Sequence, residues 1–189
     1  MKRNYNLMKK ILEDLVFLHR NFKATRKMQP IPTIKYDNFT FSGMPYNRIA
    51  ELNSIHKELK GGLSISFRNR LLMKYRGQML CATIYDENMI LGFSMHYFRD
   101  NEVEKGIIHV GYSAILPEKR GKGLMAALRQ HTAKHFSANQ LTGITANINK
   151  HNTSSLKAAV RGGFIVTKEP VEPHETLEVF MDLAKCSRF

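Results

Sequence analysis

The order of strand and helix patterns in the second half of the chain limits its possible folds more than any other feature. An apolar run over 106–116 ends at Pro117, and helical spacing follows from about 121 to 136. A further strand, a helix and two more strands are expected at 142–148, 153–161, 163–168 and 175–182. Strands that alternate with helices in this way indicate a mixed α/β domain, in which helices flank a sheet.

The first half of the chain supplies the remaining strands and two short helices. Strand patterns run over 33–42, 79–85 and 89–98, and helical spacing runs over 46–59 and 66–76. The corner Asp86-Glu87-Asn88 suits a tight hairpin between the second and third of these strands. With 189 residues, of which 43% are apolar, the chain has the size and composition of one domain with an extra N-terminal element.

That N-terminal element is a basic amphipathic segment. Apolar residues recur at helical spacing at Met8, Ile11, Leu12, Leu15, Leu18 and Phe22. Residues 1–28 hold eight Lys or Arg against two acidic residues, and prolines at 30 and 32 end the helix. We therefore expect a helical extension over 1–32 and a domain over 33–189. The helix would pack on the domain or on a second copy in a homodimer; an arm for nucleic acid or a membrane surface is a less favoured alternative.

The charge of the chain favours anionic partners. The formal net charge is +13, which suits a phosphate-bearing cofactor or an anionic acceptor, although it could also serve solubility alone. No apolar stretch is long enough to cross a bilayer, and charged residues interrupt the N-terminus where a signal peptide would need an apolar run. The two cysteines, Cys81 and Cys186, are far apart, so reduced thiols and a cytoplasmic protein are expected.

A glycine-containing turn lies between the strand at 106–116 and the helix that follows it. The run Arg120-Gly121-Lys122-Gly123 opens this helix. A helix N-terminus presents unpaired backbone N–H groups and partial positive charge, and glycines let the backbone approach an anion closely. With two added cations, the turn is a candidate phosphate site, although a plain strand-to-helix turn is the alternative. Its spacing matches neither the nucleotide P-loop nor the dinucleotide fingerprint.

A second pattern follows about thirty residues later. A helix begins behind Asn152 and ends at Gly162-Gly163, directly before a strand that starts with Phe164.

Together the two patterns make the chain resemble the GNAT superfamily of N-acetyltransferases over about residues 33–182. The family pattern Arg/Gln-x-x-Gly-x-Gly/Ala falls on Arg120, Gly123 and Met125. The later Asn…Ser…Gly-Phe pattern falls on Asn152, Ser155, Gly163 and Phe164. The resemblance implies a mixed, mostly antiparallel sheet of six to seven strands, splayed at two central parallel strands and flanked by helices. Met125 departs from the pattern, which has a small residue there.

The resemblance also implies a cofactor and its binding residues. Acetyl-CoA would serve as acyl donor, with its pantetheine arm on the backbone of Ala114, Ile115 and Leu116 and its pyrophosphate on the amides of the turn. The expected turn residues are Arg120, Gly121, Lys122, Gly123, Leu124 and Met125. Asn152 and Ser155 would line the other side of the cleft.

The expected reaction is direct attack of an amine on the thioester. The position at which many family members carry a catalytic Glu falls on His109, a reasonable general base; Glu104, Glu118 and His96 are alternatives. The family's usual acid, a Tyr, is replaced by Ala159, so Tyr112 or water is expected to protonate the thiolate, if any acid is needed.

No metal is expected, because His131 and His135 are one helical turn apart without an evident third ligand.

The acceptor is expected near a flexible, basic region. Gly61-Gly62 could form a lid, and the cations around it favour an acceptor with phosphate or carboxylate groups. These cations are Lys57, Lys60, Arg68, Arg70, Lys74 and Arg76. A local acidic pocket at Glu169, Glu172 and Glu175 could instead favour a basic acceptor.

Three functions follow from these observations. The favoured one is an N-acetyltransferase that acts on a small, anionic amine. The alternatives are an acyltransferase that acts on a protein or tRNA docked by the N-terminal arm, and a CoA-binding regulatory domain without catalysis.

Overall fold

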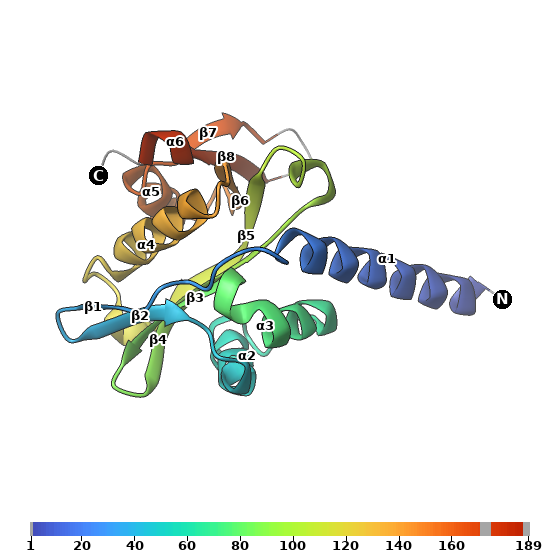
Figure 1. Ribbon diagram of the computed structural model, residues 1–189, viewed down its shortest axis with the longest axis horizontal. Coiled ribbons are helices and arrows are strands. Elements are labelled where there is room, and N and C mark those ends of the chain that lie inside the picture. The colour runs from blue at the N-terminus through green and yellow to red at the C-terminus, as the bar shows by residue number, and fades with distance from the viewer. Residues whose placement is uncertain (1, 171–174, 187–189) are drawn as a thin grey trace.

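The chain folds around one eight-stranded sheet in a computed structural model that describes residues 2–170 and 175–186 (Figure 1). The strands are β1 (Ile34–Tyr36), β2 (Phe39–Gly43), β3 (Cys81–Asp86), β4 (Met89–Tyr97), β5 (Ile107–Ile115), β6 (Gly143–Asn149), β7 (Ile165–Lys168) and β8 (Thr176–Asp182). The α-helices are α1 (Lys2–Ala24), α2 (Ile49–Leu59), α3 (Phe67–Leu80), α4 (Leu124–Ala138), α5 (Thr153–Arg161) and α6 (Leu183–Cys186). The mixed architecture expected from the element order is confirmed.

The strand number differs from the six to seven expected. The single strand predicted over 33–42 is a short hairpin, in which β1 pairs antiparallel with β2. Asp37 makes the turn with φ of 52°, a left-handed conformation that Asp tolerates better than most residues. An alternating pattern cannot by itself reveal a turn of two polar residues, and the sheet therefore gains one strand.

The sheet is antiparallel except at its centre. Its order is β1-β2-β3-β4-β5-β6-β8-β7, and β5 with β6 forms the parallel pair. Helix α4 makes the connection between these two strands and lies with α5 on one face of the sheet, while α2 and α3 lie on the other (Figure 1). Because α4 runs back along β5, its first turn lies at the end where β5 stops.

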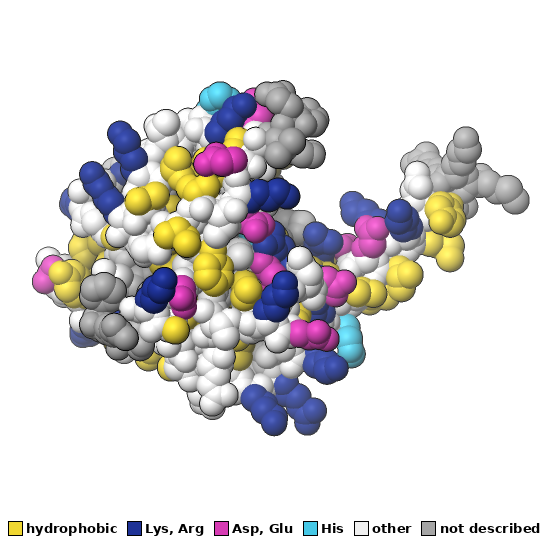
Figure 2. Space-filling view, turned by 90° about the horizontal axis from the view of Figure 1, so that it is seen from above, with side chains coloured by type: hydrophobic (Ala, Val, Ile, Leu, Met, Phe, Trp, Pro, Cys, Tyr) yellow, Lys and Arg dark blue, Asp and Glu magenta, His cyan; other side chains and the backbone are white. Residues whose placement is uncertain are grey.

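Helix α1 is anchored only by its second half. Phe17 and Leu18 are buried in the main core, and the buried Asn21 side chain accepts from the backbone N–H of Phe98 (2.7 Å). The first half of the helix stands out from the body with apolar side chains along one edge (Figure 2). Because the same segment, 1–32, contributes Met28 to that core, the boundary at residue 32 stays a prediction.

The structure bears on two expectations, the absence of a membrane-spanning helix and the state of the two cysteines. No helix in the described ranges combines the length and apolarity needed to cross a bilayer. The Cys81 thiol is free and buried, and burial raises its pKa. The side chain of Cys186 lies outside the described part of the chain.

Candidate active site

The centre of the sheet opens because β5 and β6 pair over only part of their length. Cross-strand partners run from Ile107 with Gly143 to Val110 with Ala146, and the pairing ends there. The register of β5 on β4 shifts at the next residue, Gly111, which is therefore an extra residue in β5. Such a bulge bends and twists a strand, so β5 diverges from β6 beyond this point.

A cavity of about 250 Å³ lies where the two strands diverge. Val110 and Ala146 line the end of the cavity at which the strand pairing stops, here called its closed end, while Tyr112 and Ser113 line one wall and Asn149 lines the other. Residues from both faces of the sheet also reach it. They are Lys60 from the loop after α2, and Arg129, Thr132, Asn152, Ser155, Ala159 and Phe164 from α4, α5 and the turn after α5.

The backbone of β5 offers free polar groups to this cavity. The Leu116 N–H donates to the carbonyl of Leu91 in β4 (2.8 Å), so the backbone polar groups of Leu116 face β4. Residues of an antiparallel strand alternate between the two sides, so Ala114 also faces β4, whereas Ser113 and Ile115 face the opening. The Ile115 carbonyl is already bonded to the Arg120 side chain (Nε–O 3.1 Å). Among the described residues, the N–H and C=O of Ser113 and the N–H of Ile115 therefore have no partner.

This register bears on the expected pantetheine site, which stays a prediction. Ala114, Ile115 and Leu116 were expected to bind the pantetheine arm through their backbone, but of the three only Ile115 directs a free group to the opening. Ser113 was missed. The sequence carries no signal for it, because which residues face a neighbour depends on the register with β4.

The turn between β5 and α4 is shaped for an anion. Gly121 and Gly123 have φ of 80° and 75°, and a Cβ on either would meet no atom within 4 Å. The Arg120 N–H donates to the Pro117 carbonyl. The next backbone hydrogen bond along the chain in this turn runs from the Ala127 N–H to the Gly123 carbonyl. The amides of 121–126 therefore lie in the loop and first helical turn with no such partner among the described residues.

The side chains of this turn divide between structure and solvent. Arg120 is used to hold the end of β5, whereas Lys122 is exposed. Leu124 is buried in an apolar cluster that is separate from the main core and also includes Leu128, and Met125 packs against this cluster. The bulky Met125 side chain, the departure from the family pattern, therefore points away from the glycine turn and leaves its amides accessible.

The opposite wall is formed by the start of α5. Asn152 caps this helix, because its Oδ1 accepts from the Ser155 N–H (3.1 Å) and from the Ser154 hydroxyl (3.0 Å). Asn152 and Ser155 both line the cavity, as expected from the sequence. Ala159, which lies further along α5, is buried against the same cavity and has no acidic group.

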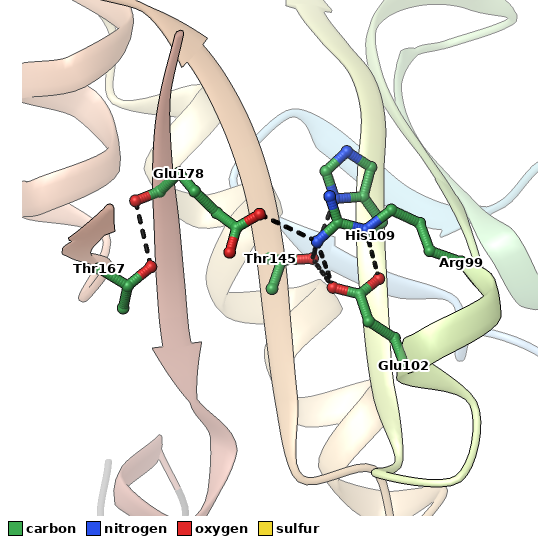
Figure 3. A network of polar contacts seen from close by, with 6 residues as sticks. All are labelled: Arg99, Glu102, His109, Thr145, Thr167 and Glu178. Atoms are coloured by element: carbon green, nitrogen blue, oxygen red, sulfur yellow. Dashed lines mark hydrogen bonds and ion pairs between the residues drawn. The ribbon is translucent and has the colours of Figure 1, made fainter. Parts of the chain in front are cut away.

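His109 lies beside the cavity in a polar network rather than on its wall (Figure 3). Its Nδ1 is 2.9 Å from the Thr145 hydroxyl, which donates to Glu102 (2.7 Å). The Thr145 proton is thus committed, so His109 donates from Nδ1 and keeps a lone pair on Nε2. Burial and the nearby Arg99 charge lower the pKa of His109 to about 4, so its imidazole is neutral at neutral pH.

Glu102 is the carboxylate of this network and was not among the candidates from the sequence. Burial raises the pKa of its carboxyl, but the bonds from Arg99 and Thr145 outweigh burial and hold that pKa below its usual range. Arg99 also pairs with Glu178 at 3.2 Å. The expected alternatives, Glu104 and Glu118, are exposed and do not line the cavity.

His96 lines the cavity but both its ring nitrogens have partners. Its Nδ1 lies 3.1 Å from the Leu80 carbonyl, which can only accept, so Nε2 accepts from the Ser94 hydroxyl (3.3 Å). Burial lowers the pKa of His96 to about 3. The ring is therefore held neutral in one tautomer, which argues against a role as base.

Tyr112 lines the cavity from the side of α2. Its ring lies 4.5 Å from the His56 ring and 4.8 Å below the Lys60 Nζ, in a cation–π contact. Burial raises its pKa, opposed by the Arg120 charge, so the phenol stays protonated at neutral pH. A protonated phenol can donate a hydrogen bond or a proton to a group in the cavity.

The cavity wall carries positive charge without a carboxylate. Among the described residues that line it, Lys60 and Arg129 are cations and no Asp or Glu is present. The candidate acidic pocket lies elsewhere, since Glu169 and Glu175 are exposed and absent from the wall, and Glu172 lies outside the described residues. No group of three potential metal ligands occurs in the described ranges.

Arg129 was not predicted from the sequence, although a signal existed. Met125, Arg129, Thr132 and Phe136 are spaced by four, three and four residues, which places the arginine in line with two buried residues of α4, Thr132 and Phe136. A charged residue in such a position is unusual and indicates a specific task.

An open strand edge beside an amide-rich glycine turn is the architecture of an acyl-CoA-dependent transferase. The family model described as the acetyltransferase (GNAT) family matches residues 49–164. The chain belongs to this family and is an acyl-CoA-dependent N-acyltransferase, with acetyl-CoA as donor. Comparison with curated protein sequences gives no match.

Solved structures share the fold at low sequence identity. A putative acetyltransferase from Salmonella typhimurium, with acetyl-CoA, has a TM-score of 0.65 and 16% identity over 78% of this chain and 95% of its own. Naa50 from Arabidopsis thaliana, with a bisubstrate analogue, gives 0.63 and 15% over 77% and 99%. A spermidine N-acetyltransferase from Vibrio cholerae, with CoA and spermine, gives 0.65 and 12% over 81% and 100%.

Proposed function

We propose that this enzyme transfers an acetyl group from acetyl-CoA to the primary amine of a small acceptor that carries negative charge. One observation supports the charge of the acceptor above all others: Lys60 lines the cavity at the proposed acceptor entrance, and the described lining residues include no carboxylate. An ammonium-rich acceptor would need carboxylates to balance its charges, as a buried or half-buried cation is costly without a partner. Among the fold neighbours is a spermidine acetyltransferase, but a polycation suits this wall poorly.

The residues present fit CoA along one continuous path. The pyrophosphate would lie on the amides after Arg120, where Gly121 and Gly123 leave the approach open. The pantetheine arm would add to the free edge of β5 at Ser113 and Ile115, and Asn152 would face it from α5. This path ends at the closed end of the cavity, where the reactive thioester would lie.

The acceptor would enter from the other face of the sheet, past the loop after α2. Lys60 lies at this entrance above the Tyr112 ring, and Lys57 and Arg70 are exposed nearby in sequence. The basic rim is smaller than the sequence suggested, because Arg68 pairs with Asp14 and the Arg76 guanidinium lies over the Phe22 ring. Those two cations hold α1 rather than a ligand.

Protons would be handled by two groups. Tyr112, protonated and on the wall, would donate to the departing thiolate or orient the amine. His109 would act as base only through a water molecule, since its ring is not on the wall. If it does, kcat/KM should stay level on acidification and fall only near pH 4, because the neutral imidazole is the basic form and its pKa is about 4. If kcat/KM no longer falls near pH 4 in His109→Gln, His109 is the group whose protonation causes the fall.

Release of CoA from acetyl-CoA tests the acceptor class. Pairs of amines that differ only in a carboxylate or phosphate group, with spermidine and an alanine-terminal peptide added, are compared by kcat/KM. The anionic member of each pair should be preferred by about tenfold or more. Lys60→Gln should reduce this preference, whereas Lys134→Gln, at an exposed lysine on α4, should not. Preference for spermidine would refute the proposal, and turnover of the peptide alone would favour a macromolecular acceptor.

A partner for α1 is the remaining part of the proposal. Large apolar side chains between residues 5 and 16 of this helix are at least half exposed, namely Tyr5, Leu7, Met8, Ile11, Leu12, Leu15 and Val16. Tyr5, Met8, Leu12 and Leu15 follow the three-four spacing of a coiled-coil seam, which favours a second copy of α1 as the partner. Seven such side chains on each copy approach the roughly 800 Å² per partner of a stable interface.

Sedimentation velocity tests this homodimer. Leu12→Glu should give monomers at concentrations at which the wild type is dimeric, and Lys10→Glu, which alters a charge outside the seam, should not. A monomeric wild type would refute the dimer. Binding of the wild type, but not of Leu12→Glu, to anionic vesicles or tRNA would assign the helix to one of those partners instead.

A further inference from the structure

Arg129 lines the cavity, and one nitrogen of its guanidinium is buried without a hydrogen-bond partner. Its stem passes close to α5, since a Cβ on Gly162 would lie 3.2 Å from its Cδ, and its guanidinium lies 5.8 Å from the Phe164 ring centre. Its Nη1 is buried without a hydrogen-bond partner, and no carboxylate pairs with it among the described residues. Burial lowers the pKa of Arg129, because the charged guanidinium loses contact with water.

An arginine in this position destabilises the ligand-free protein. A guanidinium has five N–H donors and cannot lose its charge in a protein, so a buried N–H without an acceptor costs free energy. Nearby groups do not remove this cost, because Phe164 offers only a ring face and no described residue accepts a hydrogen bond from Nη1. The missing acceptor is thus expected to come from a ligand.

The position of Arg129 indicates which part of the ligand supplies the missing acceptor. Arg129 belongs to α4, which lies with α5 on the face of the sheet opposite to α2 (Figure 1), whereas Lys60 follows α2 at the proposed acceptor entrance. Arg129 lies more than one helical turn beyond Met125, toward the closed end of the cavity lined by Val110 and Ala146. The same wall includes Ala159, whose methyl group leaves space for a larger neighbouring side chain.

We propose that Arg129 binds the sulfur of CoA as it departs as a thiolate, an inference that rests on the proposed acetyl transfer. In that step the acceptor nitrogen forms a bond to the acetyl carbon, and the carbon–sulfur bond breaks with its electron pair left on sulfur. The amine proton leaves to the base or to water. Arg129 then supplies the positive charge that balances the thiolate, so that no acid is required at position 159.

The pKa of the thiol in bound CoA tests this without any acceptor. CoA in its free thiol form is saturated onto the protein, and thiolate absorbance in the ultraviolet is followed against pH as a difference from ligand-free protein. Arg129→Met is compared with Arg161→Met, which removes an exposed arginine from the end of α5. The thiol pKa in Arg129→Met should be higher by about one unit or more than in the wild type and in the control. Arg129→Lys should keep it low.

Stability and binding measurements complete the test. Ligand-free Arg129→Met should melt at the same temperature as the wild type or higher, because an unpartnered buried charge has been replaced by an apolar side chain. Equal thiol pKa values in Arg129→Met and the wild type, with CoA bound to both, would overturn the inference. Failure of Arg129→Met to fold would also overturn it, since the guanidinium would then have a structural partner. If calorimetry shows no CoA binding to the wild type, the proposed function itself fails, and the inference with it.

Discussion

The glycine turn before α4 offers the sharpest test of the cofactor site. Gly123 has φ of 75°, so Gly123→Ala forces an L-residue into the left-handed region. This costs roughly 1–2 kcal/mol. No steric cost is added, because a Cβ at this position meets no atom within 4 Å. For a chain of 189 residues, each kcal/mol lowers the melting temperature by about 2–4 °C.

The effect on CoA should exceed the effect on stability. The new methyl group would occupy the open space in which the pyrophosphate is proposed to meet the amides. Loss of one hydrogen bond to a charged group costs about 1.5–3 kcal/mol. The dissociation constant for CoA should therefore rise about tenfold to a hundredfold.

Gly106→Ala is the matched control. Gly106 has φ of 64°, and its Cβ would make ordinary contacts of 3.5 Å with Thr142, so the backbone strain is similar. It precedes β5, at the end of that strand far from the glycine turn. Its melting temperature should fall by a similar amount with no change in CoA affinity.

Calorimetry with CoA and thermal melts with and without CoA give both quantities. A ligand that binds only the folded state raises the melting temperature in proportion to the logarithm of its concentration over its dissociation constant. Gly123→Ala should lose most of this rise, and Gly106→Ala should keep it. Unchanged CoA affinity in Gly123→Ala, or an equal loss in both variants, would refute the placement of the pyrophosphate.

Three further predictions concern stability. Burial lowers the pKa values of His109 and His135 to about 4, below the 6.5 of an unfolded histidine, so the unfolded chain binds protons first on acidification. Stability in urea should thus be full above pH 6.5 and fall by a few kcal/mol toward pH 4; a rise over that range would contradict the burial of both rings. Asn152→Ala removes a helix cap and should lower stability by about 1 kcal/mol in the same assay; no loss would mean that the cap bonds do not contribute. Glu102→Ala removes one of the two carboxylate partners of the half-buried Arg99 and should cost about 1–3 kcal/mol, whereas Glu104→Ala at an exposed site should cost almost nothing; equal effects would show that the network is not stabilising.

The features that the sequence revealed are local ones. The turn at 117–128 and the capped helix behind Asn152 each depend on neighbouring residues only, because glycine conformations and helix ends are set within a few positions of the chain. The family resemblance and the cofactor followed from these two segments, and both are confirmed. The element order likewise predicted the fold class.

What only the tertiary structure decided depends on how distant segments pair and pack. The register of β5 on β4 determines that Ser113 and Ile115, rather than Ala114 and Leu116, face the opening. Packing of α4 against α5 brings Arg129 to the cavity beside Ala159, and these contacts join residues about thirty positions apart.

The histidine at position 109 shows the same division. Its residue type and strand position suggested a base, but its environment is built from Thr145 on the next strand and Glu102 from the preceding loop. Burial and a neighbouring charge set the pKa of a side chain, and both are properties of the folded molecule. The sequence by itself therefore determined the family and its cofactor, because short local segments carry that signal, and the tertiary structure decided which side chains line the cavity and which lie beside it.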